Sequence, residues 1–468
     1  FTAVPGLNVD TTNFEIIDFF NLYITEAILQ DMVRYTNLYT EQYLASNPLP
    51  GFSRAQAWYP TNINEIKRFL ALTLAMGLVE RNSLASYWDT NTVLSIPLFS
   101  AVMPRNRYQI LLRFLHSNDN TTAVAPNEPG YDRLYKLRPL IDSLSQRFAE
   151  VYTPSQNVCV DESLLLFKGR LRFRQYIPSK RSRYGMKFYK LCESSTGYTS
   201  YFMLYEGKDT NLTLPTDLTA SGKIVWELIT PLLGRGYHLY VDNFYTSIPL
   251  FRALNSLDTP ACGTVNRNRQ LLDKKLKRGE VHALRSNELL AIKYSDTKVV
   301  FMLTTIHDET MIVQHRSGGR PSKTKPLCSK EYSKHMGGVD KSDQIQNYYN
   351  ATRKTRAWYK KAAIYMIQMA LYNSYVVYKA AVPGPRLSYY NYLLQLLPAS
   401  LPCCLVTTML PDNVGQAQIP PTPNKRYAQR KCKVCRSKGV RRDVRYYCPK
   451  CPSKPALCFH PCFEVYHT

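Results

Sequence analysis

The chain has 468 residues, of which 45% are hydrophobic and only 20% are charged, so it is long enough for several domains and too apolar to be intrinsically disordered. Its formal net charge is +25, because 60 Lys and Arg residues face 35 Asp and Glu residues. This excess favours a polyanionic partner, nucleic acid first, over a merely soluble basic protein. No apolar run approaches the ~20 residues of a membrane-spanning helix, so we expect no membrane contact.

The first third of the chain has the periodicity of amphipathic helices. Apolar residues recur at helical spacing in residues 11–46, 61–82 and 103–119. Asn62 and Glu65 are spaced as a capping box that would start the second of these helices. The plain interpretation of such apolar stripes is a helical core, and we favour it here.

A mixed α/β region follows from residue 156. The pattern predicts a strand near 157–167, a hairpin around 194–197, a helix at 221–233, a strand at 236–244, a helix at 246–255 and a short strand at 260–265. Three short antiparallel strands are expected between residues 266 and 327, as an insertion, before helix resumes at Val339. A second long helix is predicted near 360–382, followed by a proline-rich connector.

Two of the predicted strands end in an aspartate. Asp161 stands in "VCVDES" and Asp242 in "LYVDNF". A buried strand has little use for a carboxylate, because moving the charge out of water costs free energy. Binding of a hard cation explains both residues, although Asp161 could belong to a turn and Asp242 could cap the helix that follows.

A further pair of carboxylates lies in "HMGGVDKSDQ", residues 335–344. Asp340 and Asp343 are three residues apart, so they share one face of a helix. The simple explanation is that acidic residues in a first turn are favoured by the helix dipole. Together with Asp161 and Asp242, however, they form an all-oxygen ligand set that suits Mg²⁺ or Mn²⁺. Two such ions can catalyse phosphoryl transfer.

The first basic segment, residues 167–190, contains nine Lys or Arg residues and no acid. Aromatic residues alternate with the charges, a composition that suits phosphate contacts and stacking on unpaired bases. A solvated charged hairpin is the alternative. The predicted DNA-binding residues of this segment are Lys168, Arg170, Arg172, Arg174, Lys180, Arg181, Arg183 and Lys187.

The second basic segment, residues 352–361, is "TRKTRAWYKK". Its candidate DNA-binding residues are Arg353, Lys354, Arg356 and Trp358. The tryptophan could stack on a flipped or unpaired base near a cleaved end, although a tryptophan on a long helix more often packs in the core.

The C-terminal block contains six of the 12 cysteines. Two Cys-x-x-Cys pairs followed by further Cys and His residues are typical of tetrahedral Zn²⁺ sites in a reducing compartment. Two ions need eight ligands, and His460 is the least certain of them. The predicted zinc ligands are Cys432, Cys435, Cys448, Cys451, Cys458, His460, Cys462 and His467. The surrounding basic residues expected to contact DNA are Arg430, Lys431, Lys433, Arg441 and Arg442.

Five motifs resemble the piggyBac family of DNA transposases. They are "FLHSNDN", "VDESLLLFKGR", "IPSKRSRYGMKFYKLC", "VDNFYTSIPL" and "HMGGVDKSDQ", and they occur in the family's order together with the cysteine block. The resemblance implies a catalytic triad of Asp161, Asp242 and Asp340, with Asp343 as a fourth carboxylate. It also implies a ribonuclease H-like core with a β-rich insertion, a helical region for dimerisation and DNA binding, and a zinc domain that recognises transposon ends.

The resemblance predicts the following domains: helical dimerisation and DNA-binding region, 1–155; first part of the core, 156–265; insertion, 266–327; last core helix, 328–350; second helical region and linker, 351–424; zinc domain, 425–468. The expected function is cut-and-paste transposition in the nucleus by a homodimer. It would bind terminal inverted repeats, cut through a hairpin intermediate and join the ends to TTAA target DNA, using two Mg²⁺ or Mn²⁺ ions per active site and about two Zn²⁺ ions.

Two alternatives stay open from the sequence. The chain could be a domesticated DNA-binding protein that keeps the fold without the chemistry, although four intact aspartates argue against this. It could also be a metal-dependent nuclease that uses Asp161 and Glu162 with Lys168.

Overall fold

The computed structural model describes most of the chain, and the statements below concern these residues. They are 1–51, 53–91, 93–178, 183–207, 217–266, 275–314, 322–399, 417–418, 430–437, 439–444, 446–447 and 456–458. The chain divides into two compact units. The large unit comprises residues 1–82 and 106–397, and the small unit comprises residues 83–105 and 398–468.

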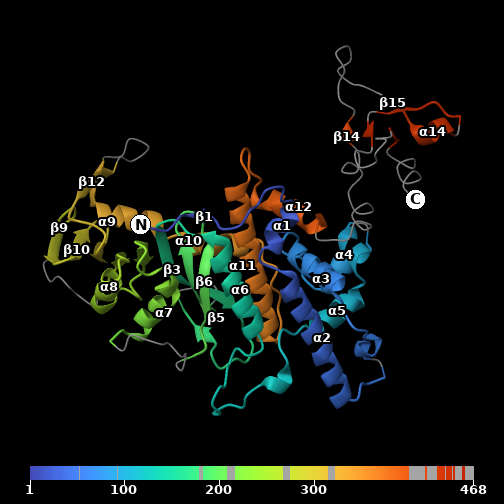
Figure 1. Cartoon of the computed structure of the whole chain (residues 1–468), viewed down its shortest axis with the longest axis horizontal. Helices are drawn as coiled ribbons and strands as arrows, with labels where there is room; N and C mark the ends of the chain where they lie inside the picture. The colour runs from blue at the N-terminus through green and yellow to red at the C-terminus, as the bar shows by residue number, and fades with distance from the viewer. Residues whose placement is uncertain are drawn as a thin grey trace. The chain divides into compact units, whose positions relative to one another are not determined.

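A nine-stranded sheet forms the centre of the large unit (Figure 1). Five of its strands form the core: β3 (Asn157–Leu166), β5 (Tyr184–Glu193), β6 (Thr199–Leu204), β7 (His238–Val241) and β8 (Ala261–Thr264). They lie in the order β6-β5-β3-β7-β8, with β3, β7 and β8 parallel and with β5 antiparallel to both of its long neighbours. The predicted strands and hairpin of this region are therefore present.

The remaining strands extend the same sheet. The edge beyond β5 carries β4 (Gln175–Tyr176), and the edge beyond β8 carries three strands of the predicted insertion. These are β11 (Val299–Thr304), β10 (Leu289–Ser295) and β9 (Val281–Ser286), of which the sequence pattern missed β9. β11 pairs directly with β8, so these inserted strands share the backbone hydrogen bonds of the core sheet. A separate hairpin joins β12 (Met311–Gln314) to β13 (Lys323–Pro326).

Helices cover both faces of the sheet. α7 (Ala220–Ile229) and α8 (Ile248–Asn255) pack on the face that carries Val160 and Val241. α9 (Leu327–His335) and α10 (Gly338–Tyr348) pack on the other face, which carries Cys159 and Tyr240. Because side chains alternate along a strand, the residues after Val160 and Val241 belong to the α9–α10 face.

α11 (Trp358–Ala381) is buried on nearly all sides and packs against α1, α6 and α10 (Figure 1). The Asn373 side chain both accepts from and donates to the Thr199 backbone, at 2.9 Å each, and so fixes α11 to β6. Such a helix could be mistaken for a membrane span, but none of the helices in the described ranges is both long enough and apolar enough to cross a bilayer.

The N-terminal part of the large unit is helical, as predicted. Asn62 caps α3 by accepting from the Glu65 backbone, whereas the Glu65 side chain binds the buried Arg107 at 2.6 Å, so only half of the predicted capping box forms. The helices of this part are α1 (Ile16–Asn21), α2 (Glu26–Ser46), α3 (Ile63–Ala75), α5 (Arg105–Phe114) and α6 (Arg138–Val151). The short strands β1 (Gly6–Leu7) and β2 (Tyr152–Thr153) pair with each other.

The other helices and strands are short. In the small unit, the Tyr87 ring packs on Phe99 of α4, with centroids 4.7 Å apart. The remaining elements are α4 (Pro97–Val102), α12 (Tyr389–Ala399), β14 (Ala417–Gln418), β15 (Arg430–Lys431), α14 (Lys433–Ser437), β16 (Asp443–Val444) and β17 (Tyr446–Tyr447).

A glycine sets how closely α10 approaches the sheet. A Cβ atom added to Gly338 would lie 2.7 Å from the Cys159 sulfur and 2.8 Å from the Glu193 carbonyl oxygen. Both neighbours belong to strands and are held by the ladder, so neither can yield easily. The preceding Gly337 has φ −79° and no atom within 4 Å of such a Cβ.

We therefore predict that Gly338→Ala destabilises the large unit by about 1–3 kcal/mol, the usual cost of overpacking. Gly337→Ala, its neighbour and control, should change stability by less than about 1 kcal/mol. Urea unfolding followed by circular dichroism measures both. Equal stability of the two variants would show that α10 does not approach β3 as described.

Candidate active site and nucleic-acid surface

The register between β3 and β7 places Asp161 beside Asp242. Cys159 pairs with Tyr240 and Val160 pairs with Val241, so the two aspartates are the next residues on adjacent parallel strands. Neighbouring strands lie about 4.8 Å apart, and both side chains belong to the α9–α10 face. Two residues that are 81 positions apart in sequence thus lie side by side. Asp242 follows the end of β7 as predicted, but the predicted strand end at Asp161 is wrong, because β3 continues to Leu166 in its pairing with β5.

α10 brings Asp340 to the same edge. Gly338 and Val339 contact Cys159, which precedes Asp161 by two residues, and Asp340 follows in the first turn of the helix with an exposed side chain. No three described carboxylates have oxygens that all lie within 4.8 Å of one another. The three aspartates therefore do not by themselves form a closed ligand shell for one small cation.

The electrostatics also place Asp161 and Asp242 together. Burial, together with the nearby carboxylates of Asp242 and Asp161, raises the pKa of Tyr332 to about 12. Burial also raises the pKa of Asp242, and the nearby Glu162 adds to this rise. Crowded carboxylates repel one another, and a divalent cation relieves that repulsion; an all-oxygen donor set is the one that Mg²⁺ and Mn²⁺ prefer.

Three hydrogen-bond donors fix the position of the Asp343 carboxylate. Its Oδ1 atom accepts from Ser163 Oγ at 2.7 Å, from Lys190 Nζ at 2.8 Å and from the Tyr365 hydroxyl at 3.4 Å. Lys190 lies on β5 opposite Asp161 and is fully buried. Burial alone would lower the pKa of Lys190, but Asp343 and Tyr365 raise it, so the ammonium stays charged. Lys190 was not among the predicted site residues; a lysine inside an apolar strand was the available signal.

Glu162 lies on the opposite face of β3 from Asp161, because the two residues are consecutive in a strand. Its carboxylate accepts from the Tyr245 hydroxyl at 3.1 Å and lies 4.0 Å from Lys187 Nζ. Lys187 is 8% exposed and its ammonium lies over the rings of Tyr189 and Phe244. This predicted DNA contact is therefore mostly covered by protein.

The two basic segments meet at one cavity. Lys168, Gly169, Arg170 and Arg356 line an open space of about 590 Å³. Trp358, at the start of α11, is half-buried with its ring 5.3 Å from that of Phe173 and edge-on to it. The segments are about 190 residues apart in sequence, so the fold combines their charges into one surface that suits a phosphate backbone.

The other predicted contacts of these segments divide into three groups. Arg172, Arg174, Arg183 and Lys354 are exposed, although Arg174 also donates to the carbonyls of Lys168 and Gly169. Arg353 is half-buried and donates to the Arg81 carbonyl oxygen at 2.8 Å, which gives it a structural contact. Lys180 and Arg181 lie outside the described residues.

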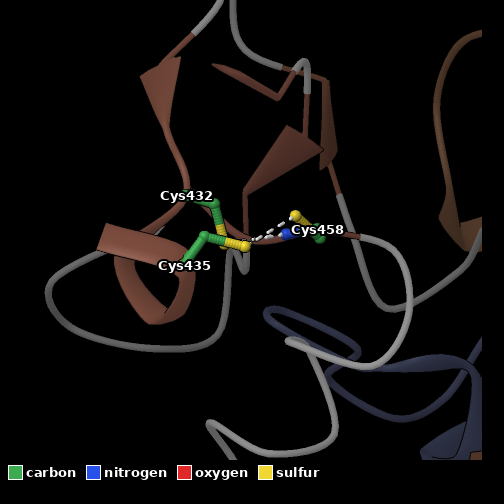
Figure 2. Close-up of side chains that lie close together, drawn as sticks. All are labelled: Cys432, Cys435 and Cys458. Atoms are coloured by element: carbon green, nitrogen blue, oxygen red, sulfur yellow. Dashed lines mark hydrogen bonds between the residues drawn. The ribbon is translucent and has the colours of Figure 1, made fainter. Parts of the chain in front are cut away.

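Three of the predicted zinc ligands come together in the small unit. The ligand atoms of Cys432, Cys435 and Cys458 lie within 4.8 Å of one another, and all three residues are buried. Figure 2 shows the three side chains gathered at one point. Cys458 thus joins the first Cys-x-x-Cys pair, a pairing that the sequence left open. Cys448, Cys451, His460, Cys462 and His467 lie outside the described residues.

The surroundings of Cys432 favour its thiolate form, which is the form that binds a metal. Burial alone would raise the pKa of Cys432, but backbone N–H groups of Cys435 and Cys458 donate to its sulfur and lower the pKa to about 7. Three thiolates need one more ligand to complete a tetrahedral zinc site. The predicted DNA contacts around them are all exposed; they are Arg430, Lys431, Lys433, Arg441 and Arg442.

Comparisons with known proteins agree with this arrangement. Residues 17–375 match the family model described as "Transposase IS4", and residues 422–468 match the model described as "DDE_Tnp_1-like zinc finger". The chain belongs to the piggyBac-type transposase family. The predicted resemblance is therefore confirmed.

Two human proteins are relatives of this piggyBac-type chain. PiggyBac transposable element-derived proteins 3 and 2 of Homo sapiens are 26% and 25% identical to it over 398 and 383 residues, which is 81% and 78% of this chain. The matched parts cover 63% and 61% of those two proteins, so the chain corresponds to less than two thirds of their length.

A solved structure is similar over almost the whole chain. It is the cryo-EM structure of a piggyBac transposase synaptic complex with hairpin DNA, with a TM-score of 0.75 and 25% identity, and the match covers 97% of this chain and 98% of that one. The mixed α/β fold is thus that of a piggyBac transposase.

If the cavity contacts phosphates, removing its charges should reduce the salt dependence of DNA binding. We predict that Lys168→Gln, Arg170→Gln and Arg356→Gln together lower the slope of log K against log[salt] by about 3, since each contact contributes ~0.9. Lys67→Gln, Lys298→Gln and Lys330→Gln remove the same charge from exposed positions elsewhere. Fluorescence anisotropy measures both triples, and an equal loss in both would mean that the cavity provides only diffuse attraction.

For the zinc site, we predict that Cys458→Ser removes one equivalent of zinc, measured by elemental analysis of the purified chain. Cys328→Ser, which changes a buried cysteine of the core sheet, should remove none. Zinc should also be stripped by chelators more easily as pH falls from about 8 to about 6, because protons then compete for the Cys432 thiolate. Full zinc content in Cys458→Ser would contradict the assigned site.

Proposed function

We propose that this chain is a cut-and-paste DNA transposase whose active site consists of Asp161, Asp242 and Asp340. The observation that carries the proposal is the register of β3 and β7, which sets two aspartates side by side facing the helix that carries the third. The strand order β6-β5-β3-β7-β8 supports a ribonuclease H-like core, because three antiparallel strands followed by parallel ones is the order of that fold. The helices before residue 155 would then serve dimerisation and DNA binding.

The side chains support phosphoryl transfer on a DNA strand. Two bound Mg²⁺ or Mn²⁺ ions would supply activation of the attacking oxygen and stabilisation of the leaving oxygen. The aspartates would hold these cations, and a bound cation would counter the rise in the pKa of Asp242. The cavity lined by Lys168, Arg170 and Arg356 would hold the phosphate backbone, and the half-buried Trp358, two residues after Arg356, could stack on an unpaired base. No protein nucleophile is needed, since water and then a DNA 3′-hydroxyl can attack.

The DNA substrate follows from the relatives. The similar cryo-EM structure is a synaptic complex with hairpin DNA, so we propose that this chain also cuts through a hairpin intermediate. Binding of terminal inverted repeats, insertion at TTAA, assembly as a homodimer and a nuclear location complete the proposal. About two zinc ions would fold the C-terminal residues, whose exposed basic side chains suit contact with the ends.

The position of Glu162 favours this function over a nuclease that uses Asp161 with Glu162 and Lys168. The two carboxylates lie on opposite faces of β3, so they do not point into one site. Lys168 lines the cavity instead.

We predict that Asp161→Asn, Asp242→Asn and Asp340→Asn each lower cleavage of a matching end by more than about 100-fold, beyond the usual cost of losing an outer-shell partner of a metal. DNA affinity should change less than about twofold, since the substitutions remove no positive charge. Asp308→Asn, an exposed control, should cleave normally. Cleavage is followed on labelled end DNA with Mg²⁺. Cleavage that survives both Asp242→Asn and Asp340→Asn would support the alternative nuclease. If the unmodified chain does not cleave, the chain would be a DNA-binding protein without catalysis.

A further inference from the structure

α10 is joined to β3 at two points that lie on either side of Asp161. Cys159, Asp161 and Ser163 alternate along β3 and therefore share the face on which α10 packs. The Cys159 sulfur packs against Gly338 so closely that a Cβ atom added there would lie 2.7 Å from it. The Ser163 hydroxyl donates to Asp343 at 2.7 Å, one helical turn further along α10.

The first connection lies where α10 has no side-chain cap. α10 begins at Gly338 after Gly337, and its cap residue makes no side-chain hydrogen bond. A capping side chain usually fixes the start of a helix. Here the start of α10 is fixed by packing, because Gly338 and Val339 lie against Cys159 of the strand that carries Asp161.

The second connection is reinforced from β5 and α11. Lys190 Nζ lies 2.8 Å from Asp343 Oδ1 and 2.8 Å from the Tyr365 hydroxyl, and its side chain is fully buried. A buried ion pair adds little net stability compared with a well-packed apolar group. Its geometry is nonetheless specific, because three donors from two strands and a helix converge on one carboxylate oxygen.

We propose that Cys159 and Ser163, together with Lys190 and Asp343, are positioning residues that clamp α10 to β3 and so set the separation of Asp161 from Asp340. Asp340 lies between the two connections on α10, as Asp161 does on β3. Asp343 acts here through its Oδ1 contacts, as an anchor of the helix. This inference rests on the proposed function, because it assigns the clamp to a metal-binding pair of aspartates.

The test uses the full chain bound to end DNA and three variants. Cys159→Ala removes the sulfur that packs against the start of α10, and Ser163→Ala removes the donor to Asp343. Ser342→Ala is the matched control, because Ser342 is also buried on α10 and its hydroxyl accepts from Gln346 within the same helix. Ser163→Thr keeps a hydroxyl at the same position and should restore the unmodified behaviour.

Two readouts separate positioning from general stability. Hydrogen exchange reports whether the amides of residues 338–340 open, and electron paramagnetic resonance of free Mn²⁺ reports its affinity. We expect Cys159→Ala to speed hydrogen exchange of the amides of residues 338–340 by at least about tenfold. We expect Cys159→Ala and Ser163→Ala each to weaken Mn²⁺ binding by about 10–100-fold, the usual cost of losing an outer-shell partner of a metal. The melting temperatures should stay close to that of Ser342→Ala.

The clamp is overturned if exchange and Mn²⁺ affinity in Cys159→Ala and Ser163→Ala match those of Ser342→Ala while Asp340→Asn still weakens Mn²⁺. The proposed function would survive that result. If Asp340→Asn leaves Mn²⁺ affinity unchanged, the proposed function fails, and the clamp has no metal site to position.

Discussion

The structure depends on the contact between one strand and one helix. β3 is the strand where the antiparallel and parallel halves of the sheet meet, so its register fixes β5 on one side and β7 on the other. α10 lies against the same strand so closely that only glycine fits at its first position. Every acidic residue of the candidate active site belongs to β3, to the end of its parallel neighbour or to this helix, so a shift of α10 would separate them.

Charge is distributed in opposite ways over two adjoining parts of the large unit. The acidic side chains gather around the middle of β3, where Asp161 lies beside the end of β7, whereas Lys168, Arg170 and Arg356 surround a cavity that begins just beyond the end of β3. DNA phosphates are attracted to the cavity and repelled by the carboxylates. Divalent cations resolve this conflict, because they neutralise the acids and bind phosphate oxygens directly. Metal binding and DNA binding should therefore be mutually dependent in this chain.

The sequence was sufficient for features that follow from local patterns. The aspartate after β7, the helical apolar periodicity and the first cysteine pair all predicted features that the structure contains. The sequence was insufficient for features that depend on distant pairing. Asp161 lies inside β3 and not at its end, because the pairing with β5 extends the strand to Leu166. Cys159 sits inside an apolar strand, where nothing local distinguishes it from a residue of the plain core, and the charge of Lys190 marked it as unusual without indicating its partner Asp343. Likewise, Cys458 could have joined either cysteine pair, and β9 had too little apolar character to be recognised.

The central claim is that Asp161, Asp242 and Asp340 hold divalent cations at one site beside DNA. The most direct test is anomalous diffraction from crystals of the full chain with end DNA, collected at the manganese edge in Mn²⁺. The account predicts anomalous peaks bonded to carboxylate oxygens of all three residues. Peaks absent from this edge of the sheet, or bonded to other side chains, would contradict it.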